Sequence, residues 1–144
     1  MGMATISFND IDVYYEVSGQ GQPLLLIHGL GSSSQIWEAQ VRYFAERYRV
    51  ITYDLRGHGR SSKPTDAYSV QQFAKDAARI LRDLDVPAAH VVGISLGGMI
   101  AFEIAVHYPQ LLKSLAVVNS APAIRVESIR DRFNLWQRSL IFKR

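Results

Sequence analysis

Cysteine is absent from this chain of 144 residues. Its absence excludes disulfides, thiolate metal sites and cysteine catalysis, and it fits a reducing compartment such as the cytoplasm. The first 19 residues lack a basic segment followed by an apolar one, so the sequence predicts no secretory signal and a cytoplasmic protein. No apolar run approaches the roughly 20 residues of a membrane span. With 48% hydrophobic and 20% charged residues, the composition is typical of a globular domain.

An excess of positive charge is missing from most of the chain, although the net charge is +3. Residues 124–144 contain six Lys or Arg and two acidic residues, whereas the rest of the chain contains ten basic and eleven acidic residues. The basicity therefore belongs to the tail and not to the domain. No recognition motif for nucleic acid is found, so no nucleic-acid partner is predicted.

Hydrophobic periodicity predicts strands that alternate with helices. Two β-rich runs, 4–8 and 13–17, flank a short polar turn and indicate an N-terminal β-hairpin. The later apolar runs do not alternate, which is typical of parallel strands covered on both faces. The predicted buried strands are 24–29, 48–54, 90–94 and 111–119, and the predicted helices are 35–48, a segment from the Ser69 cap to before Pro87, and 96–108. This order predicts an α/β fold with a mostly parallel sheet and helices on both faces.

The predicted boundary of this domain is the segment "NSAP", residues 119–122. Beyond it the sequence predicts a basic amphipathic helix, because apolar residues recur at alternating steps of three and four. These residues are Val126, Ile129, Phe133, Trp136 and Leu140. The chain stops within this helix and without a C-cap, so we expect a truncated chain.

Ser95 is the predicted nucleophile. It lies in a Gly-x-Ser-x-Gly pattern, Gly93 to Gly97, between a predicted strand and a predicted helix. In such a turn the serine adopts a strained backbone conformation, and small neighbours let the strand and the helix approach each other. A glycine-rich turn with a merely structural serine is the alternative.

A predicted oxyanion hole accompanies the serine. Such a hole needs two backbone N–H groups that converge on one point. Leu96, directly after the serine, supplies one, and Leu30 in the segment "IHGLGSSSQIW" supplies the other, with Gly29 and Gly31 allowing a close approach. His28 precedes this loop too closely to reach the serine, so we expect a structural role for it.

The segment "DLRGHGRSSKP", residues 54–64, has two interpretations. Asp54 and Arg56 could act as a catalytic acid and an anion clamp. The density of glycine instead favours a tight loop held by hydrogen bonds of Asp54, Arg56 and His58, and this is the interpretation we prefer.

These three segments, in this order, resemble the α/β-hydrolase fold superfamily. The segments are "HGLG", "DLRGHGRS" and "GISLGG", and the resemblance covers residues 5–122. It is strongest for the branch of carboxylesterases, enol-lactone hydrolases and C–C hydrolases. It implies that residues 1–122 form the N-terminal part of the hydrolase core, truncated before its last strands, and that residues 123–144 begin a helical cap.

The resemblance also implies a reaction. The expected activity is hydrolysis of ester, lactone or related acyl bonds of a small molecule through a serine nucleophile, with no cofactor and no metal. In the family the acid and the histidine follow the nucleophile along the chain, so both are expected from later strands.

None of the four histidines suits the role of base. His28 and His58 lie in loops already assigned, and His90 begins a strand. His107 lies near the far end of the helix that starts at Leu96, roughly 17 Å from Ser95 along the axis. We therefore expect the triad histidine and acid to be missing from residues 1–144 and this chain to be inactive alone.

Two other hypotheses remain. The chain could be a non-catalytic binding module that uses the same pocket, and the presence of His and Asp downstream would decide between the two. The basic tail could lie on an anionic membrane or in a partner's groove, but a cap role is favoured over a membrane partner. An exposed sheet edge or cap surface would favour self-association.

Overall fold

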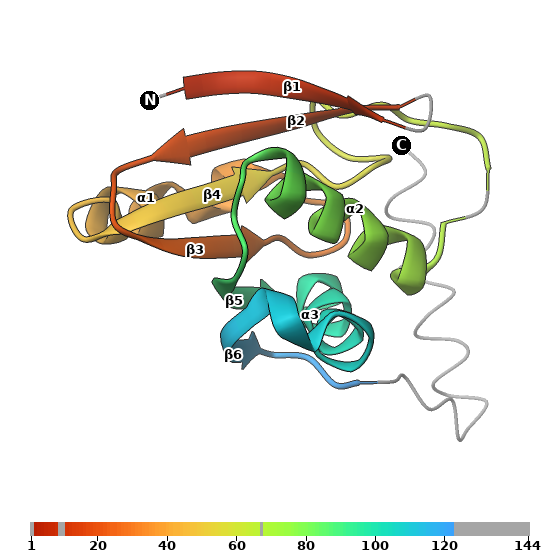
Figure 1. Ribbon diagram of the computed structural model, residues 1–144. Helices are drawn as coiled ribbons and strands as arrows, with labels where there is room; N and C mark the ends of the chain where they lie inside the picture. Colours follow the sequence, from red (N-terminus) through yellow and green to blue (C-terminus); the bar gives the residue numbers. More distant parts are fainter. Residues whose placement is uncertain (1, 9–10, 67, 123–144) are drawn as a thin grey trace.

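The computed structural model describes residues 2–8, 11–66 and 68–122. Its six strands form one sheet in the order β1-β2-β4-β3-β5-β6 (Figure 1). The strands are β1 Gly2–Phe8, β2 Ile11–Ser18, β3 Gln22–Ile27, β4 Tyr48–Tyr53, β5 Ala89–Ile94 and β6 Leu112–Val118. The hairpin β1–β2 and the pair β2–β4 are antiparallel, and the other three pairs are parallel. The predicted α/β class, with an N-terminal hairpin and a mostly parallel sheet, is confirmed.

Helices cover the two faces of this sheet. Helices α2 (Val70–Asp83) and α3 (Leu96–His107) pack on one face, and α1 (Glu38–Phe44) lies on the other (Figure 1). Consecutive residues of β3 divide between two apolar cores: Leu25 and Ile27 belong to the larger one, Leu24 and Leu26 to the smaller one. Residues Leu24–Ile27 of this central strand are therefore all apolar, because both faces are buried there.

The start of α2 follows the predicted capping pattern. The Ser69 side chain accepts a hydrogen bond from the Gln72 N–H at 3.1 Å, which satisfies one of the free N–H groups of the first turn. The helix turns an apolar face, including Phe73 and Ile80, into the larger core. Asp76 is a charged exception on that buried face, with only 2% of its surface exposed.

The predicted helix 35–48 was too long. A 3-10 turn, Ser34–Trp37, precedes α1, and α1 ends at Phe44. Tyr48, which continues the helical spacing of apolar residues, begins β4 and pairs with Gln22 of β3. An apolar residue at that point fits both periodicities, and pairing with the central strand decides between them. The predicted helix within residues 123–144 lies outside the described residues.

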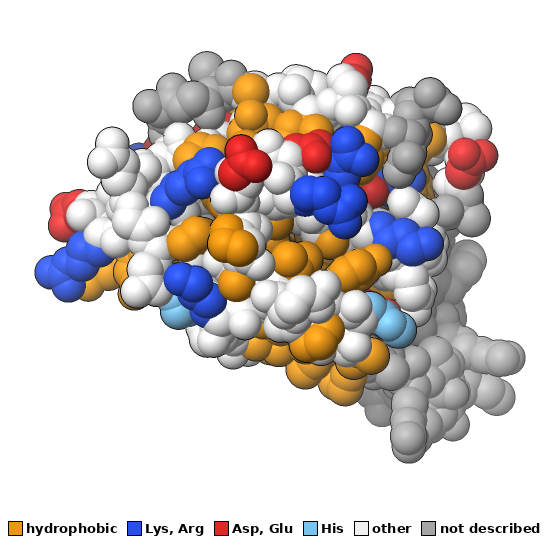
Figure 2. Space-filling model, in the orientation of Figure 1, with side chains coloured by type: hydrophobic (Ala, Val, Ile, Leu, Met, Phe, Trp, Pro, Cys, Tyr) orange, Lys and Arg blue, Asp and Glu red, His pale blue; other side chains and the backbone are white. Residues whose placement is uncertain are grey.

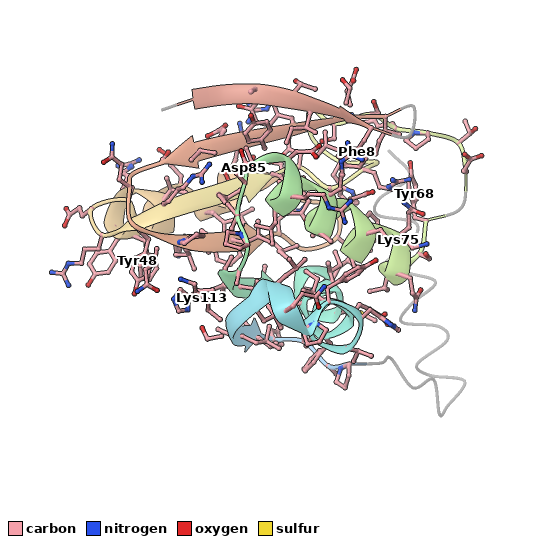
Figure 3. The ribbon with its side chains drawn as sticks, viewed as in Figure 1. Phe8, Tyr48, Tyr68, Lys75, Asp85 and Lys113 are labelled. Atoms are coloured by element: carbon pink, nitrogen blue, oxygen red, sulfur yellow. The ribbon has the colours of Figure 1, made fainter. Side chains whose placement is uncertain are left out.

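The carboxyl ends of the parallel strands meet at one edge of the sheet. In Figure 3, Tyr48 and Lys113 mark the side on which β4 and β6 begin, and Tyr68 lies on the opposite side, beyond the end of β4. The loops after β3, β4 and β5 all reach that opposite side. In open α/β sheets, ligands bind at this carboxyl edge.

β6 is one of the two edge strands of the sheet in the described part of the chain, and β1 is the other. There β6 pairs only with β5, and apolar side chains are exposed over α3 and β6 (Figure 2). Val106 is 70% exposed and Val118 is 44% exposed. Self-association through this edge stays a prediction. Among the described residues, no helix has both the length and the apolar character needed to cross a membrane.

Candidate active site

Ser95 lies at the sharp turn from β5 into α3, with φ +53° and ψ −118°. A non-glycine residue in this region carries strain of about 1–3 kcal/mol. The glycines on either side allow the turn. A Cβ added to Gly93 would lie 2.2 Å from the Gly97 carbonyl oxygen, and one added to Gly97 would lie 2.2 Å from the Ile27 carbonyl oxygen. The predicted crowding of strand and helix around Ser95 is therefore present.

Backbone hydrogen bonds tie Ser95 to its surroundings. Its N–H donates to the Val118 carbonyl at 3.0 Å. Its carbonyl accepts from the N–H groups of Gly98 and Met99, at 2.9 and 3.2 Å, and from the Ser120 hydroxyl at 2.6 Å. The strained turn is thus held both by the first turn of α3 and by the end of β6.

The loop after β3 lies against the serine side chain. Gly29 is buried, and a Cβ added to it would lie 3.3 Å from Ser95 Cβ and 3.8 Å from Ser95 Oγ. Ser95 itself is exposed. Glycine at position 29 thus brings the backbone of the predicted oxyanion loop into contact with the predicted nucleophile.

The N–H groups of the two predicted oxyanion donors have no hydrogen-bond partner among the described residues. Leu96 is the first residue of α3, so its N–H has no carbonyl one turn earlier in the helix. Within the described ranges, neither the Leu96 nor the Leu30 N–H donates a hydrogen bond. The amino end of α3 also favours negative charge near Ser95, because helix N–H groups carry partial positive charge there.

His28 is fully buried and bonded through both ring nitrogens. Its Nε2 accepts from the Leu55 N–H at 3.0 Å, so its Nδ1 carries the proton and donates to the Gly29 carbonyl at 2.8 Å. Burial lowers the pKa of this imidazole. The side chain links the oxyanion loop to the loop after β4, in agreement with the structural role expected for it.

The other three histidines also have partners of their own. Among the described residues, no histidine ring forms a hydrogen bond with Ser95. His58 Nδ1 contacts the Arg56 carbonyl at 3.0 Å, His90 contacts Ser114 Oγ and Gln22 Oε1 at 2.8 and 2.9 Å, and His107 pairs with Glu103 at 3.1 Å.

Asp54 holds the loop after β4 together. Its buried carboxylate accepts from the N–H groups of Ser34 and Arg60, at 2.7 and 2.8 Å. Burial by itself would raise the pKa of the Asp54 carboxyl, but these hydrogen bonds together hold it below its ordinary value. A Cβ on Gly59 would lie 2.1 Å from Asp54 Oδ2, so only glycine lets the loop fold over this carboxylate. Both oxygens are engaged, which favours the structural interpretation over a catalytic acid.

Arg56 is engaged in the same way. Its guanidinium group forms two hydrogen bonds, of 2.5 and 2.6 Å, with the Asp76 carboxylate of α2. This bidentate pair explains why a carboxylate is tolerated on the buried face of that helix. Asp76 could not be found from the sequence, because an acidic residue within an apolar helix face has no local signal for its partner.

A groove of about 510 Å³ lies beside α1, and Ser95 does not line it. Its walls carry two ion pairs, Arg42 with Glu38 and Arg60 with Glu16. In the described part of the chain, this groove is therefore distinct from the surroundings of Ser95.

The comparisons identify the family. The family model of the alpha/beta hydrolase fold matches residues 22–139. The RutD protein of Azorhizobium caulinodans is 41% identical over 110 residues, which are 76% of this chain and 42% of RutD. The 3-oxoadipate enol-lactonase 2 of Acinetobacter baylyi is 35% identical over 122 residues, which are 83% of this chain and 46% of the lactonase. The chain belongs to the α/β-hydrolase fold family.

Solved structures of hydrolases have the same fold as this chain. Est816, an N-acyl homoserine lactone degrading enzyme, superposes with a TM-score of 0.83 and 30% identity over 95% of this chain and 54% of Est816. A hydrolase from Pseudomonas aeruginosa gives a TM-score of 0.85 and 27% identity over 96% of this chain and 52% of its own. The predicted membership of a hydrolase superfamily with enol-lactonase-like relatives is confirmed. The chain spans about half the length of the curated relatives it matches.

Proposed function

We propose that the protein hydrolyses ester, lactone or related acyl bonds of small molecules through attack by Ser95 Oγ. The observation that carries this proposal is the backbone of Ser95, with φ +53° between β5 and α3. Strain of this kind persists where the surroundings enforce it, and it concentrates at sites of chemistry. Here the turn presents an exposed hydroxyl beside the oxyanion loop.

The proposed first step forms a bond between Ser95 Oγ and the substrate carbonyl carbon. A base takes the hydroxyl proton, and the carbonyl electron pair moves onto the carbonyl oxygen. The N–H groups of Leu30 and Leu96 stabilise that oxyanion. Its collapse breaks the bond to the leaving group, which receives the proton. Water then cleaves the acyl-serine ester by the same sequence and releases the acid.

The base and its acid are proposed to come from outside residues 1–144. Each of the four histidines has partners of its own, and the Asp54 carboxylate is fully engaged. A serine hydroxyl without a neighbouring base is a poor nucleophile at neutral pH. We therefore propose that residues 1–144 by themselves hydrolyse activated esters negligibly.

The substrate class that we propose is supported by some of the named relatives. They include an enol-lactonase and an N-acyl homoserine lactone degrading enzyme, both named for lactones. A lactone carries an electrophilic carbonyl with an oxygen leaving group. A small molecule with such a carbonyl, cyclic or open, is the substrate that we propose.

Covalent labelling tests the nucleophile. In the full natural chain that carries residues 1–144, a fluorophosphonate probe is expected to label Ser95, and Ser95→Ala should abolish the labelling. Ser114→Ala is the matched control, because Ser114 is an exposed serine of β6 that contacts His90 and not the turn. Labelling that survives in the folded Ser95→Ala protein would contradict the proposal. Absence of labelling in both the wild type and Ser95→Ala would instead indicate a non-catalytic binding module.

A further inference from the structure

We propose that Ser120 is a positioning residue for the oxyanion hole. Its hydroxyl orients and polarises the peptide between Ser95 and Leu96, whose N–H faces the developing negative charge. This inference rests on the proposed function and deepens it. Ser120 lies outside the three motifs that define the family resemblance, in the segment that follows β6.

The contact joins two distant parts of the chain. Ser120 Oγ donates to the Ser95 carbonyl at 2.6 Å, and the Val118 carbonyl accepts the Ser95 N–H at 3.0 Å. The N–H of Ser95 is therefore bonded to the end of β6, and its carbonyl is bonded to the segment that follows this strand. Hydrogen bonds at both groups hold the strained turn in one orientation.

Close packing fixes the Ser120 side chain. A Cβ added to Gly98, in the first turn of α3, would lie 2.5 Å from Ser120 Cβ and 2.7 Å from Ser120 Oγ. Asn119 has φ +47°, a left-handed conformation that asparagine tolerates better than most residues, and it places Ser120 next to this helix. The half-buried hydroxyl is therefore held in place rather than free on the surface.

The geometry of the peptide group connects this contact to the oxyanion. In a planar trans peptide the C=O and the N–H point in opposite directions within one plane. The plane that holds the Ser95 carbonyl also holds the Leu96 N–H. Hydrogen bonds to the carbonyl thus fix the direction of the N–H, and they polarise it into a stronger donor.

Ser120 differs from the other two donors to this carbonyl. Gly98 and Met99 belong to α3, so their N–H groups move with the helix. Ser120 follows the strand and ties the same carbonyl to the sheet. Its hydroxyl therefore fixes the Leu96 N–H relative to the oxyanion loop, which also extends from the sheet.

The expected effect is smaller than the loss of an oxyanion donor. Removal of one donor costs about 10²- to 10³-fold in kcat. Loss of one hydrogen bond that acts through the peptide should cost about three- to tenfold. Because the oxyanion forms only in the transition state, the loss should fall on kcat and leave KM within about twofold.

The test uses the full natural chain and p-nitrophenyl acetate. Ser120→Ala is expected to lower kcat by about three- to tenfold, and Ser120→Thr, which keeps the hydroxyl, should recover most of it. Phenylboronic acid, which forms a tetrahedral adduct with a nucleophilic serine, should lose affinity by the same factor as kcat. Ser114→Ala, the control on β6, should match the wild type in both measurements.

Three results would overturn the inference. One is a folded Ser120→Ala protein with wild-type kcat, and another is a loss that appears in KM alone. The third result applies if Ser120→Ala fails to fold. Ser120→Cys keeps the size of the side chain but donates a weaker hydrogen bond, and wild-type kcat in that folded variant would also overturn the inference. All three leave Ser95-dependent turnover, and hence the proposed function, intact. Wild-type protein without Ser95-dependent turnover would instead overturn the proposed function together with this inference.

Discussion

The loop after β4 and the turn after β5 both lie at the carboxyl edge of the sheet and both are rich in glycine, yet they use polar side chains differently. In the loop after β4, Asp54 is buried, the Arg56 side chain is 11% exposed, and both are bonded within the protein. At the turn after β5, Ser95 is exposed on a strained backbone. Polar groups that are fully bonded stabilise the fold, whereas a strained and exposed group is available for reaction.

After the loss of Ser95 itself, the largest effect expected at this edge concerns the oxyanion loop. Leu30→Pro removes the backbone N–H, whereas Leu30→Ala keeps it. In the full natural chain we expect the proline variant to lose about 10²- to 10³-fold in kcat and the alanine variant to stay within a few-fold of the wild type. Ester hydrolysis by proteins with matched circular dichroism spectra measures the difference. Equal losses in both variants would assign the role to the side chain and contradict an amide donor.

A substitution in the loop after β4 should lower the free energy of unfolding and leave kcat unchanged. Asp54→Asn replaces a carboxylate that accepts two backbone N–H bonds by an amide with one acceptor oxygen. One buried N–H then loses its partner, at a cost of about 1–3 kcal/mol in the free energy of unfolding. Urea unfolding measures this cost, and Asp66→Asn, at an exposed position, is the control. A folded Asp54→Asn protein of unchanged stability with abolished turnover would restore Asp54 as a catalytic acid.

The smallest effect is a dependence of stability on pH. Burial lowers the pKa of His28 in the folded protein below its ordinary value of 6.5. The unfolded chain therefore binds this proton first as the pH falls, so the stabilisation is complete above about pH 6.5 and is lost toward the lowered folded pKa. The slope from this single group is at most about 1.4 kcal/mol per pH unit.

Unfolding measured between pH 7 and pH 5 isolates this contribution. His28→Gln should flatten the acid side of the stability profile relative to the wild type. An unchanged slope in His28→Gln would mean that His28 does not titrate differently in the folded and unfolded chains.

The features that sequence analysis predicted correctly depend on local patterns. The continuous apolar run of β3 reflects burial on both faces, and the glycines at 93 and 97 reflect the crowding around Ser95. The end of α1 was predicted wrongly because Tyr48 fits a helix and a strand equally well, and the strand gains pairing with β3. Only a long-range contact decides such a case.

The remaining features depend on contacts between distant residues. Asp76 is acceptable on a buried helix face only because Arg56 lies opposite it. The Ser120 hydroxyl reaches the Ser95 carbonyl across 25 positions of the sequence. Neither residue has a neighbour in the sequence that signals its role, so periodicity and motifs could not find them.

Hydrolysis of p-nitrophenyl acetate by the full natural chain and its Ser95→Ala variant tests the central claim most directly. We predict saturable turnover by the wild type and a loss of at least about 10³-fold in Ser95→Ala, with unchanged thermal unfolding. Saturable turnover of equal rate in the folded Ser95→Ala protein would contradict the account, because the exposed hydroxyl at the strained turn would then take no part in the reaction.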